Sequence, residues 1–94
     1  MLRDGQYFGD EDLDLIFIAK KLREAKELEE VLTRAGLDYL IETDTYLGGF
    51  LFRAERVGAF FYVRPADAQT ARGMLVKTGF RPYVPEGAMG QPSD

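Results

Sequence analysis

The hydrophobic pattern of the chain centres on residues 57–63, an apolar run of β-branched and aromatic residues that ends at Arg64-Pro65. The run is too short for a helix and is typical of a strand, and the proline suits the first turn of a following helix. One face of this strand, which we expect helices to cover, consists of Val57, Ala59, Phe61 and Val63. The other face carries Gly58, Phe60 and Tyr62. Two aromatic rings on an uncovered sheet would indicate a partner, a ligand or a second copy of the chain.

Two other segments have the patterns of strands. Residues 13–19 are apolar on both faces after Asp14, which predicts a strand in the middle of the sheet. Strict alternation puts one set on the inner face: Leu13, Leu15, Phe17 and Ala19. Ile16 and Ile18 then extend the face that carries Phe60 and Tyr62. Residues 37–43 alternate cleanly, with Leu37, Tyr39 and Ile41 inward, which is typical of an edge strand.

Residues 20–35 and 65–78 have the spacing of amphipathic helices. The apolar positions of the first helix recur at intervals of three and four: Leu22, Ala25, Leu28, Val31, Leu32 and Ala35. Gly36 should end this helix, and because no Ser, Thr, Asp or Asn precedes its start, we expect no side-chain cap there. The second helix begins at Pro65, has Asp67 in its first turn and should end at Gly79.

The remaining segments are predicted to be loops and short strands. Residues 44–49 interrupt the alternation with Asp44 and the pair Gly48-Gly49, so this loop is the best candidate for ligand contact, with plain turn geometry as the alternative. It has neither a phosphate-binding nor a dinucleotide-binding motif. Residues 50–54 should pair with 57–63 as a hairpin across Glu55-Arg56. Residues 80–84 should form a last strand, which Pro82 restricts to an edge.

This order of elements predicts an α+β fold of the ferredoxin-like, or split βαβ, type. Two helices should cover one face of an antiparallel sheet whose middle strands are residues 13–19 and 57–63. The single domain is expected to span residues 13–84. A flexible N-terminal arm, residues 1–12, should precede it, with Tyr7 and Phe8 available to dock on the body. A flexible C-terminal tail, residues 85–94, should follow.

Composition then removes whole classes of function. The 94 residues suffice for one domain and carry a net charge of −4, which weighs against binding to nucleic acid or anionic membranes. Neither a membrane span nor the layout of a secretion signal is visible, so we expect a cytoplasmic protein. Cysteine and histidine are both absent. Their absence excludes disulfides, thiol nucleophiles, imidazole acid–base chemistry and serine–histidine triads.

The densest acidic cluster is Asp10-Glu11-Asp12, with Asp14 beyond it. Closely spaced carboxylates can hold calcium or magnesium, but a calcium loop also needs a glycine at its turn and a closing glutamate, and that pattern is missing. We interpret the cluster as a solvated approach to the first strand. The sequence therefore predicts no metal site and no cofactor.

Several of these segments resemble a known family: residues 16–19, the helix end at residues 31–37, the loop at residues 47–49 and residues 61–68. They are similar to the bacterial signal-transducing protein family, a set of small domains of unknown function. The resemblance covers about residues 15–78. It implies a compact ferredoxin-like domain with a signalling or regulatory role, and it supplies no catalytic residues. The chain departs from the family in its uncapped first helix and its acidic N-terminal approach.

Three functional hypotheses follow. The favoured one is a noncatalytic regulatory or protein-interaction domain that meets a protein partner, a second copy as a homodimer, or a small ligand. The candidate residues for that contact are Ile16, Ile18, Tyr46, Gly48, Gly49, Phe60 and Tyr62. The second hypothesis is an RNA-binding domain that stacks bases on Phe60 and Tyr62. The third is an enzyme that uses the carboxylates of Glu42 and Asp44.

Overall fold

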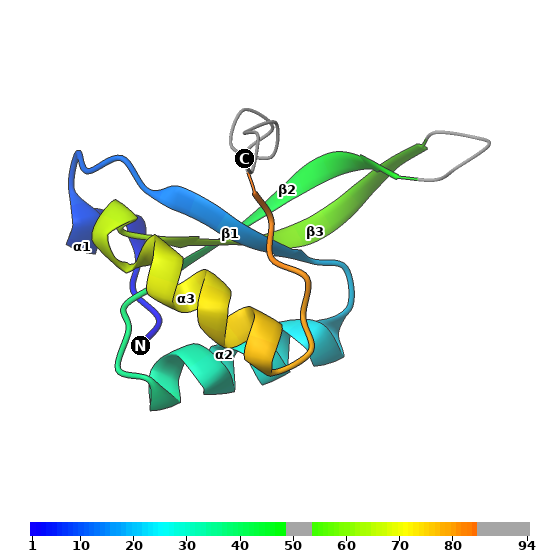
Figure 1. Ribbon diagram of the computed structural model, residues 1–94. Helices are drawn as coiled ribbons and strands as arrows, with labels where there is room; N and C mark the ends of the chain where they lie inside the picture. The colour runs from blue at the N-terminus through cyan, green and yellow to red at the C-terminus, as the bar shows by residue number, and fades with distance from the viewer. Residues whose placement is uncertain (49–53, 85–94) are drawn as a thin grey trace, which may run out of the picture.

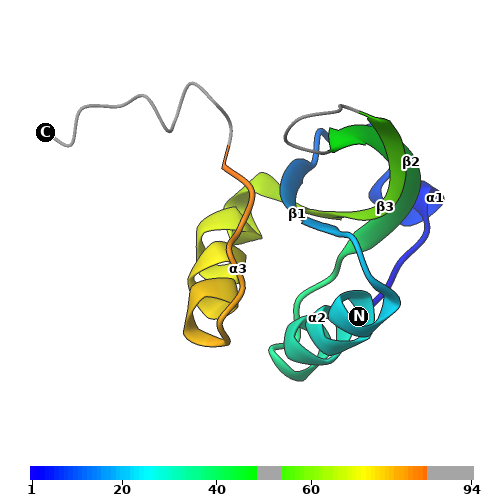
Figure 2. The same cartoon turned by 90° about the vertical axis from the view of Figure 1, so that its right-hand side faces the viewer.

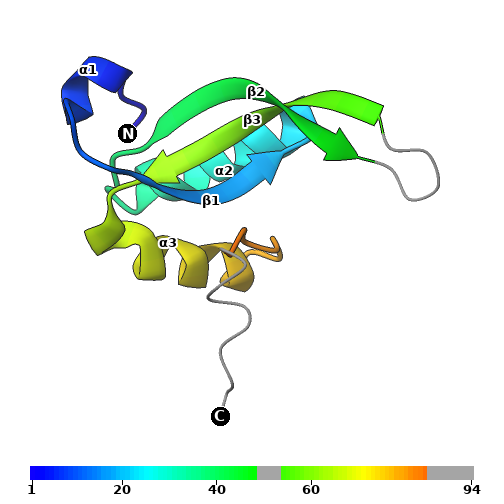
Figure 3. The same cartoon turned by 90° about the horizontal axis from the view of Figure 1, so that it is seen from above.

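A three-stranded antiparallel sheet with helices against one face forms the body of the computed structural model, which describes residues 1–48 and 54–84 (Figure 1). The elements in chain order are α1 (Gly5–Phe8), β1 (Asp14–Ala19), α2 (Leu22–Arg34), β2 (Leu40–Gly48), β3 (Ala54–Val63) and α3 (Pro65–Lys77). The strand order is β1-β3-β2, which Figure 3 shows from above. The predicted α+β class and the central position of residues 57–63 are confirmed.

Both long helices end at the glycines that the sequence predicts, and α3 begins at Pro65 as predicted, whereas α2 begins at Leu22 and not at the predicted Lys20. Pro65 opens α3, and the start of α2 has no side-chain cap. Gly36 and Gly79 follow the two helices with φ angles of 78° and 92°, a left-handed conformation that glycine adopts without steric cost. None of the helices in residues 1–48 and 54–84 has the length and apolar character needed to cross a bilayer.

The core lies between the sheet and the pair α2 and α3, which both lie on one side of the strands (Figures 1 and 2). Leu28 and Leu32 of α2 and Leu75 of α3 are fully buried against Phe61 and Val63 of β3. Tyr39, just before β2, is also buried, and its ring stacks on Phe61 with centroids 5.9 Å apart. The inward direction predicted for Tyr39 and Phe61 is thus confirmed.

A β-bulge in β1 changes which residues face the core. Leu15 pairs with Tyr62, but the next pair is Phe17 with Phe61, so Ile16 is an extra residue without a partner in β3. The bulge lets both Ile16 and Phe17 enter the core, where their exposed fractions are 0% and 8%. Leu15 is left beside Tyr62 on the other face. The predicted assignment of Leu15 to the inner face and Ile16 to the outer face is therefore wrong.

The hairpin is formed by β2 and β3, and not by residues 50–54 with 57–63. Asp44 pairs with Gly58, Tyr46 with Arg56 and Leu47 with Glu55, so residues 44–48 continue the strand that was predicted to end at Thr43. Glu55 and Arg56, predicted to form the turn, lie within β3. Cross-strand pairing with β3 overrides the local glycine signal, since each added pair satisfies backbone groups that a loop would leave to water. Gly49 and the predicted strand at 50–53 lie outside the described residues.

The first strand lies at an edge of this sheet and not in its middle as predicted, because residues 80–84 do not form a strand. They run beside β1 with one backbone hydrogen bond, from Tyr83 N to Ile16 O at 2.6 Å. Arg72 also holds this segment against β1. Its guanidinium donates to Leu15 O and to Tyr83 O, both at 3.0 Å. The carbonyls of Leu15 and Ile16 at the bulge thus accept hydrogen bonds from α3 and from the segment that follows it.

The N-terminal arm lies against the body, and the sequence had identified Tyr7 and Phe8 as residues that could dock there. Leu2 forms an isolated parallel bridge with Tyr39, and the ring of Phe8 is buried. The guanidinium of Arg64 lies over the Phe8 ring, 5.1 Å from its centroid. The predicted flexibility of this arm stays a prediction, and the predicted tail, residues 85–94, lies outside the described residues.

Candidate functional site

The sheet face opposite α2 and α3 carries an apolar surface. We call it the open face and define it by five residues: Leu15, Ile18, Leu40, Phe60 and Tyr62. Strand pairing arranges them in two rows, because Tyr62 is paired with Leu15 on one side and Leu40 on the other, and Phe60 is paired with Ile18. All five side chains are half-buried. They do not belong to the core cluster, and they are not fully exposed to solvent.

The structure places the predicted site residues in three different settings. Ile18, Phe60 and Tyr62 lie together on the open face as predicted. Ile16 does not, because the bulge turns it into the core, and its assignment to this surface is wrong. Whether Ile18, Phe60 and Tyr62 bind a partner stays a prediction.

Tyr46 and Gly48 belong to strand β2 and not to a loop, and they extend the open face toward the tip of the hairpin. A Cβ atom added at Gly58 would lie 3.0 Å from both the Tyr46 ring and the Ile18 side chain. Gly58 thus lets Tyr46 and Ile18 approach the same stretch of β3 backbone. A Cβ atom added at Gly48 would lie 2.7 Å from Arg56 Cδ, so the Arg56 side chain crosses over Gly48.

Basic residues gather at this end of the open face. A hollow of about 290 Å³ is lined by Lys20, Lys21, Tyr46, Gly48 and Arg56, and we call it the basic hollow. The ammonium of Lys20 lies 5.5 Å from the centroid of the Tyr46 ring, within the range of a cation–π contact. Among the described residues no acidic side chain lines the hollow, although the chain as a whole is acidic. The arrangement can attract one anionic group.

Sequence reasoning did not predict that the three cations of this hollow lie together. Lys20 and Lys21 precede α2, and Arg56 lies in β3, so only the fold brings them together. The adjacent pair Lys20-Lys21 was the one local signal of a basic site, and the same pair is equally typical of the solvated start of a helix.

Two carboxylates border the open face along β2. Glu42 is paired with Phe60 and Asp44 with Gly58, so both lie on the Tyr62 side of the sheet. Burial raises the pKa of the Tyr62 hydroxyl above its ordinary value, and the negative charges of Glu42 and Asp44 raise it further. A neutral hydroxyl beside two carboxylates is a hydrogen-bond donor at neutral pH.

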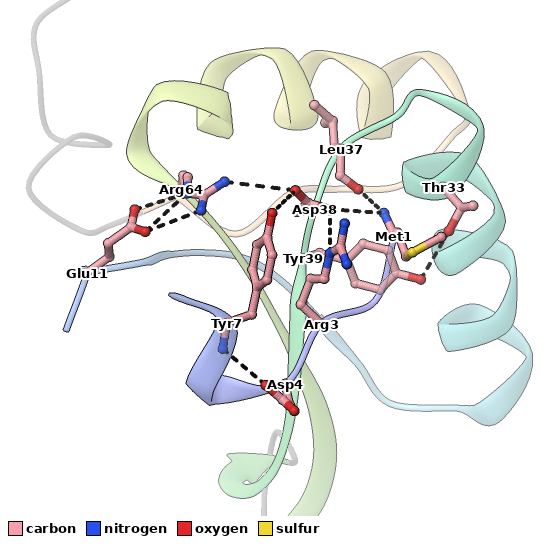
Figure 4. A network of polar contacts seen from close by, with 10 residues as sticks. All are labelled: Met1, Arg3, Asp4, Tyr7, Glu11, Thr33, Leu37, Asp38, Tyr39 and Arg64. Carbon is pink, nitrogen blue, oxygen red and sulfur yellow. Dashed lines mark hydrogen bonds and ion pairs between the residues drawn. The ribbon is translucent and has the colours of Figure 1, made fainter. Parts of the chain in front are cut away.

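A second polar cluster, which Figure 4 shows from close by, attaches the N-terminal arm. Asp38 accepts hydrogen bonds from Arg3 Nε at 2.9 Å and from the Tyr7 hydroxyl at 3.1 Å. Arg64 reaches Glu11, with Nε 3.0 Å from Oε1. The acidic cluster at residues 10–12 therefore supplies Glu11 to an ion pair with the body. Because its charges pair with one another, this cluster holds the arm against the body, and we call it the clamp.

Comparisons of the chain with protein-family models, with curated proteins and with solved structures returned no match in any of the three.

Proposed function

We propose that the chain is a noncatalytic regulatory domain that recognises a protein partner through its open face. The observation that carries the proposal is the half-buried pair Phe60 and Tyr62, which lies with Ile18 on the sheet face opposite α2 and α3. Aromatic side chains that stay partly in contact with water lack part of the stabilisation that full burial would give. They contribute most to an interface, where aromatic residues are enriched in the buried centre.

The charges around the open face define the chemistry of the partner. Glu42 and Asp44 border it along β2, and the basic hollow borders it at the tip of the hairpin. A partner that complements this surface is an extended protein segment with an apolar centre, a basic residue to meet Glu42 and Asp44, and an acidic residue to meet Lys20 and Arg56. Complementary charge of this kind sets the orientation of a partner and speeds its association.

Selection from a random peptide library displayed on phage tests the proposal with the intact chain. We expect selected peptides to combine apolar residues with one basic and one acidic residue. Phe60→Ser should weaken binding of the strongest peptide by about tenfold or more, which is the loss expected on removing a central aromatic anchor. Val76→Ser is the matched control, because Val76 is 62% exposed on α3.

A charge variant keeps the test independent of folding. Glu42→Lys changes an exposed side chain, and it should weaken the same peptide unless the basic residue of the peptide is replaced by an acidic one. The proposal is overturned if no peptide is enriched, or if the selected peptides bind wild type, Phe60→Ser and Glu42→Lys equally well. Circular dichroism of each variant would verify that the fold is retained.

RNA binding is the second candidate, and the basic hollow is the observation that favours it. Lys20, Lys21 and Arg56 line one hollow with Tyr46, at the end of a face that also carries Phe60 and Tyr62. Basic residues beside aromatic rings are the elements with which proteins hold single strands. The net charge of −4 opposes this function. Salt-dependent binding of mixed-sequence single-stranded RNA, lost in Lys20→Glu, would establish it, and an absence of binding at low salt would dismiss it.

Catalysis by Glu42 and Asp44 has less support. The two carboxylates lie on one face of one strand, and the titratable group that responds to both is the Tyr62 hydroxyl. That arrangement offers a hydrogen-bond donor near two negative charges, which serves binding as readily as proton transfer. We therefore propose that these three residues orient the partner.

We further propose that the fold is of the ferredoxin-like type, with residues 80–84 in the place of its fourth strand. Two observations support this. The hydrogen bond from Tyr83 N to Ile16 O puts the segment along the free edge of β1, and α2 and α3 share one face of the sheet. Such a fold agrees with the resemblance to the bacterial signal-transducing protein family, from which the regulatory role is also inferred.

A further inference from the structure

The helix-side face of the sheet continues beyond the helices that cover it. The β2–β3 hairpin extends past the start of α2 (Figures 1 and 3). There the apolar pattern of the core continues, and its side chains are exposed in the described part of the chain. Val57 belongs to the same strand face as Phe61 and Val63 yet is 63% exposed, and Leu22 belongs to the apolar stripe of α2 yet is 71% exposed.

A third apolar side chain completes this surface. Leu47 is 64% exposed and is paired with Glu55, two residues from Val57 on the same strand face, so Leu47 and Val57 are diagonal neighbours. On the other side, Val57 and Leu22 line one shallow hollow of about 250 Å³. We call Leu22, Val57 and Leu47 the uncovered stripe. It is distinct from the open face, which lies on the other side of the sheet.

The charges at the two ends of the uncovered stripe are opposite. Lys21 lies beside Leu22 and lines the same hollow, whereas Glu55 is the strand partner of Leu47. Lys21 therefore lies on the Leu22 side of Val57, and Glu55 lies with Leu47 on the other side. A two-fold axis through Val57 exchanges the ends, so that Leu22 of one copy meets Leu47 of the other and Lys21 meets Glu55. Surfaces that match themselves in this way form closed dimers.

We propose that the uncovered stripe is the interface between two copies of this chain, related by a two-fold axis near Val57. Each contact occurs twice. The two Val57 side chains pack at the centre, and two Lys21–Glu55 pairs flank them at the rim. Burial of the uncovered stripe, whose three side chains are the most exposed large apolar ones described on this hairpin and on α2, supplies the attraction. The paired charges fix the orientation.

Sedimentation equilibrium of the full chain over a wide range of concentration at low ionic strength tests this interface. We expect a monomer–dimer equilibrium in wild type. Lys21→Glu and Glu55→Lys should each raise the dimer dissociation constant by about tenfold, because two like-charge contacts arise in each dimer. The double variant Lys21→Glu/Glu55→Lys should restore the wild-type constant to within about threefold, since it only reverses the direction of the two pairs.

Variants of apolar residues separate this interface from general surface effects. Val57→Ser should abolish the dimer, whereas Val76→Ser, at a residue that is 62% exposed on α3, should leave it unchanged. Phe60→Ser, which disrupts the open face, should also leave the dimer intact, so failure of the partner proposal and failure of the dimer proposal are distinguishable. A strict monomer, a dimer that survives Val57→Ser, or a double charge variant that stays monomeric would each overturn the two-fold arrangement.

Discussion

The guanidinium of Arg3 donates from Nε to Oδ1 of Asp38 at 2.9 Å, although 35 residues separate them in the chain. The Tyr7 hydroxyl donates to the second oxygen of the same carboxylate at 3.1 Å. Between these contacts, Arg3 N donates to Tyr39 O and Tyr39 N donates to Met1 O. Asp38, which lies just before β2, thus binds two residues of the N-terminal arm, Arg3 and Tyr7.

The first prediction concerns the pH dependence of this clamp. The hydrogen bond from Arg3, and then the one from Tyr7, hold the pKa of Asp38 below its ordinary value of 3.8. Because the folded-state pKa is depressed, the stabilisation is fully present above pH 3.8 and is lost as the pH falls through the lower folded-state pKa. We expect the protection of the Arg3 amide against hydrogen exchange to fall over that range.

The variant Asp38→Asn should reduce the protection of the Arg3 amide several-fold already at neutral pH, since it removes the charge that both donors meet. Asp10→Asn is the matched control, because Asp10 is an exposed carboxylate of the same N-terminal region. Exchange measured by NMR at each amide would contradict the clamp if Asp38→Asn and Asp10→Asn gave the same protection.

The helices could be predicted because their signals are local. Pro65 sets the start of α3, and Gly36 and Gly79 set the ends of both helices, so each of these three boundaries depends on one or two residues. The strand register could not be predicted in the same way. The bulge at Ile16 and the pairing of Tyr46 with Arg56 depend on residues far apart in the chain, and strict alternation assumes that no such shift occurs.

The same distinction applies to the candidate surfaces. Phe60 and Tyr62 were found because they alternate within one strand that also lies at the centre of the sheet. Lys20 and Arg56 come together only after folding, and the exposure of Val57 depends on where α2 begins relative to the hairpin. The alternating pattern of residues 57–63 identifies Val57 as a core position, and it gives no indication of how far the covering helix extends.

The second prediction concerns Tyr62 on the open face. Burial is the main cause of its raised pKa, and the carboxylates of Glu42 and Asp44 add to it. The contribution of the neutral hydroxyl to stability is therefore fully present when the pH is below the ordinary pKa of 10.0. It is lost as the pH rises through the higher folded-state pKa. The double variant Glu42→Gln/Asp44→Asn should lower the pKa of Tyr62 but leave it above 10.0, because the burial remains.

Titration of ¹³Cζ-labelled tyrosine by NMR, with Tyr62→Phe for assignment, measures this pKa directly. Glu55→Gln is the control, because Glu55 lies on the opposite face of the sheet and should leave the titration of Tyr62 unchanged. An unaltered pKa in the double variant would show that the two carboxylates do not act on the hydroxyl.

The third prediction tests the bulge in β1 by comparing two isoleucines two residues apart. Ile16 is fully buried, so Ile16→Ala should lower the free energy of unfolding by about 2–5 kcal/mol through lost burial and a cavity. Ile18 is half-buried on the open face, so Ile18→Ala should cost about 1 kcal/mol. Urea denaturation measures both. Equal losses would indicate that Ile16 and Ile18 share one face, as strict alternation requires.

The fourth prediction concerns Arg72, which joins α3 to the bulge and to the segment after the helix. Its guanidinium donates to Leu15 O and Tyr83 O, and Tyr83 N in turn donates to Ile16 O. Arg72→Met keeps much of the aliphatic side chain but removes both donors, so the free energy of unfolding should fall by about 2 kcal/mol, as for hydrogen bonds from charged groups. The Tyr83 amide should also lose protection against hydrogen exchange. Arg81→Met, at an exposed arginine of the same segment, should change neither quantity. Full protection of the Tyr83 amide in Arg72→Met would mean that the segment holds its place along β1 without the arginine.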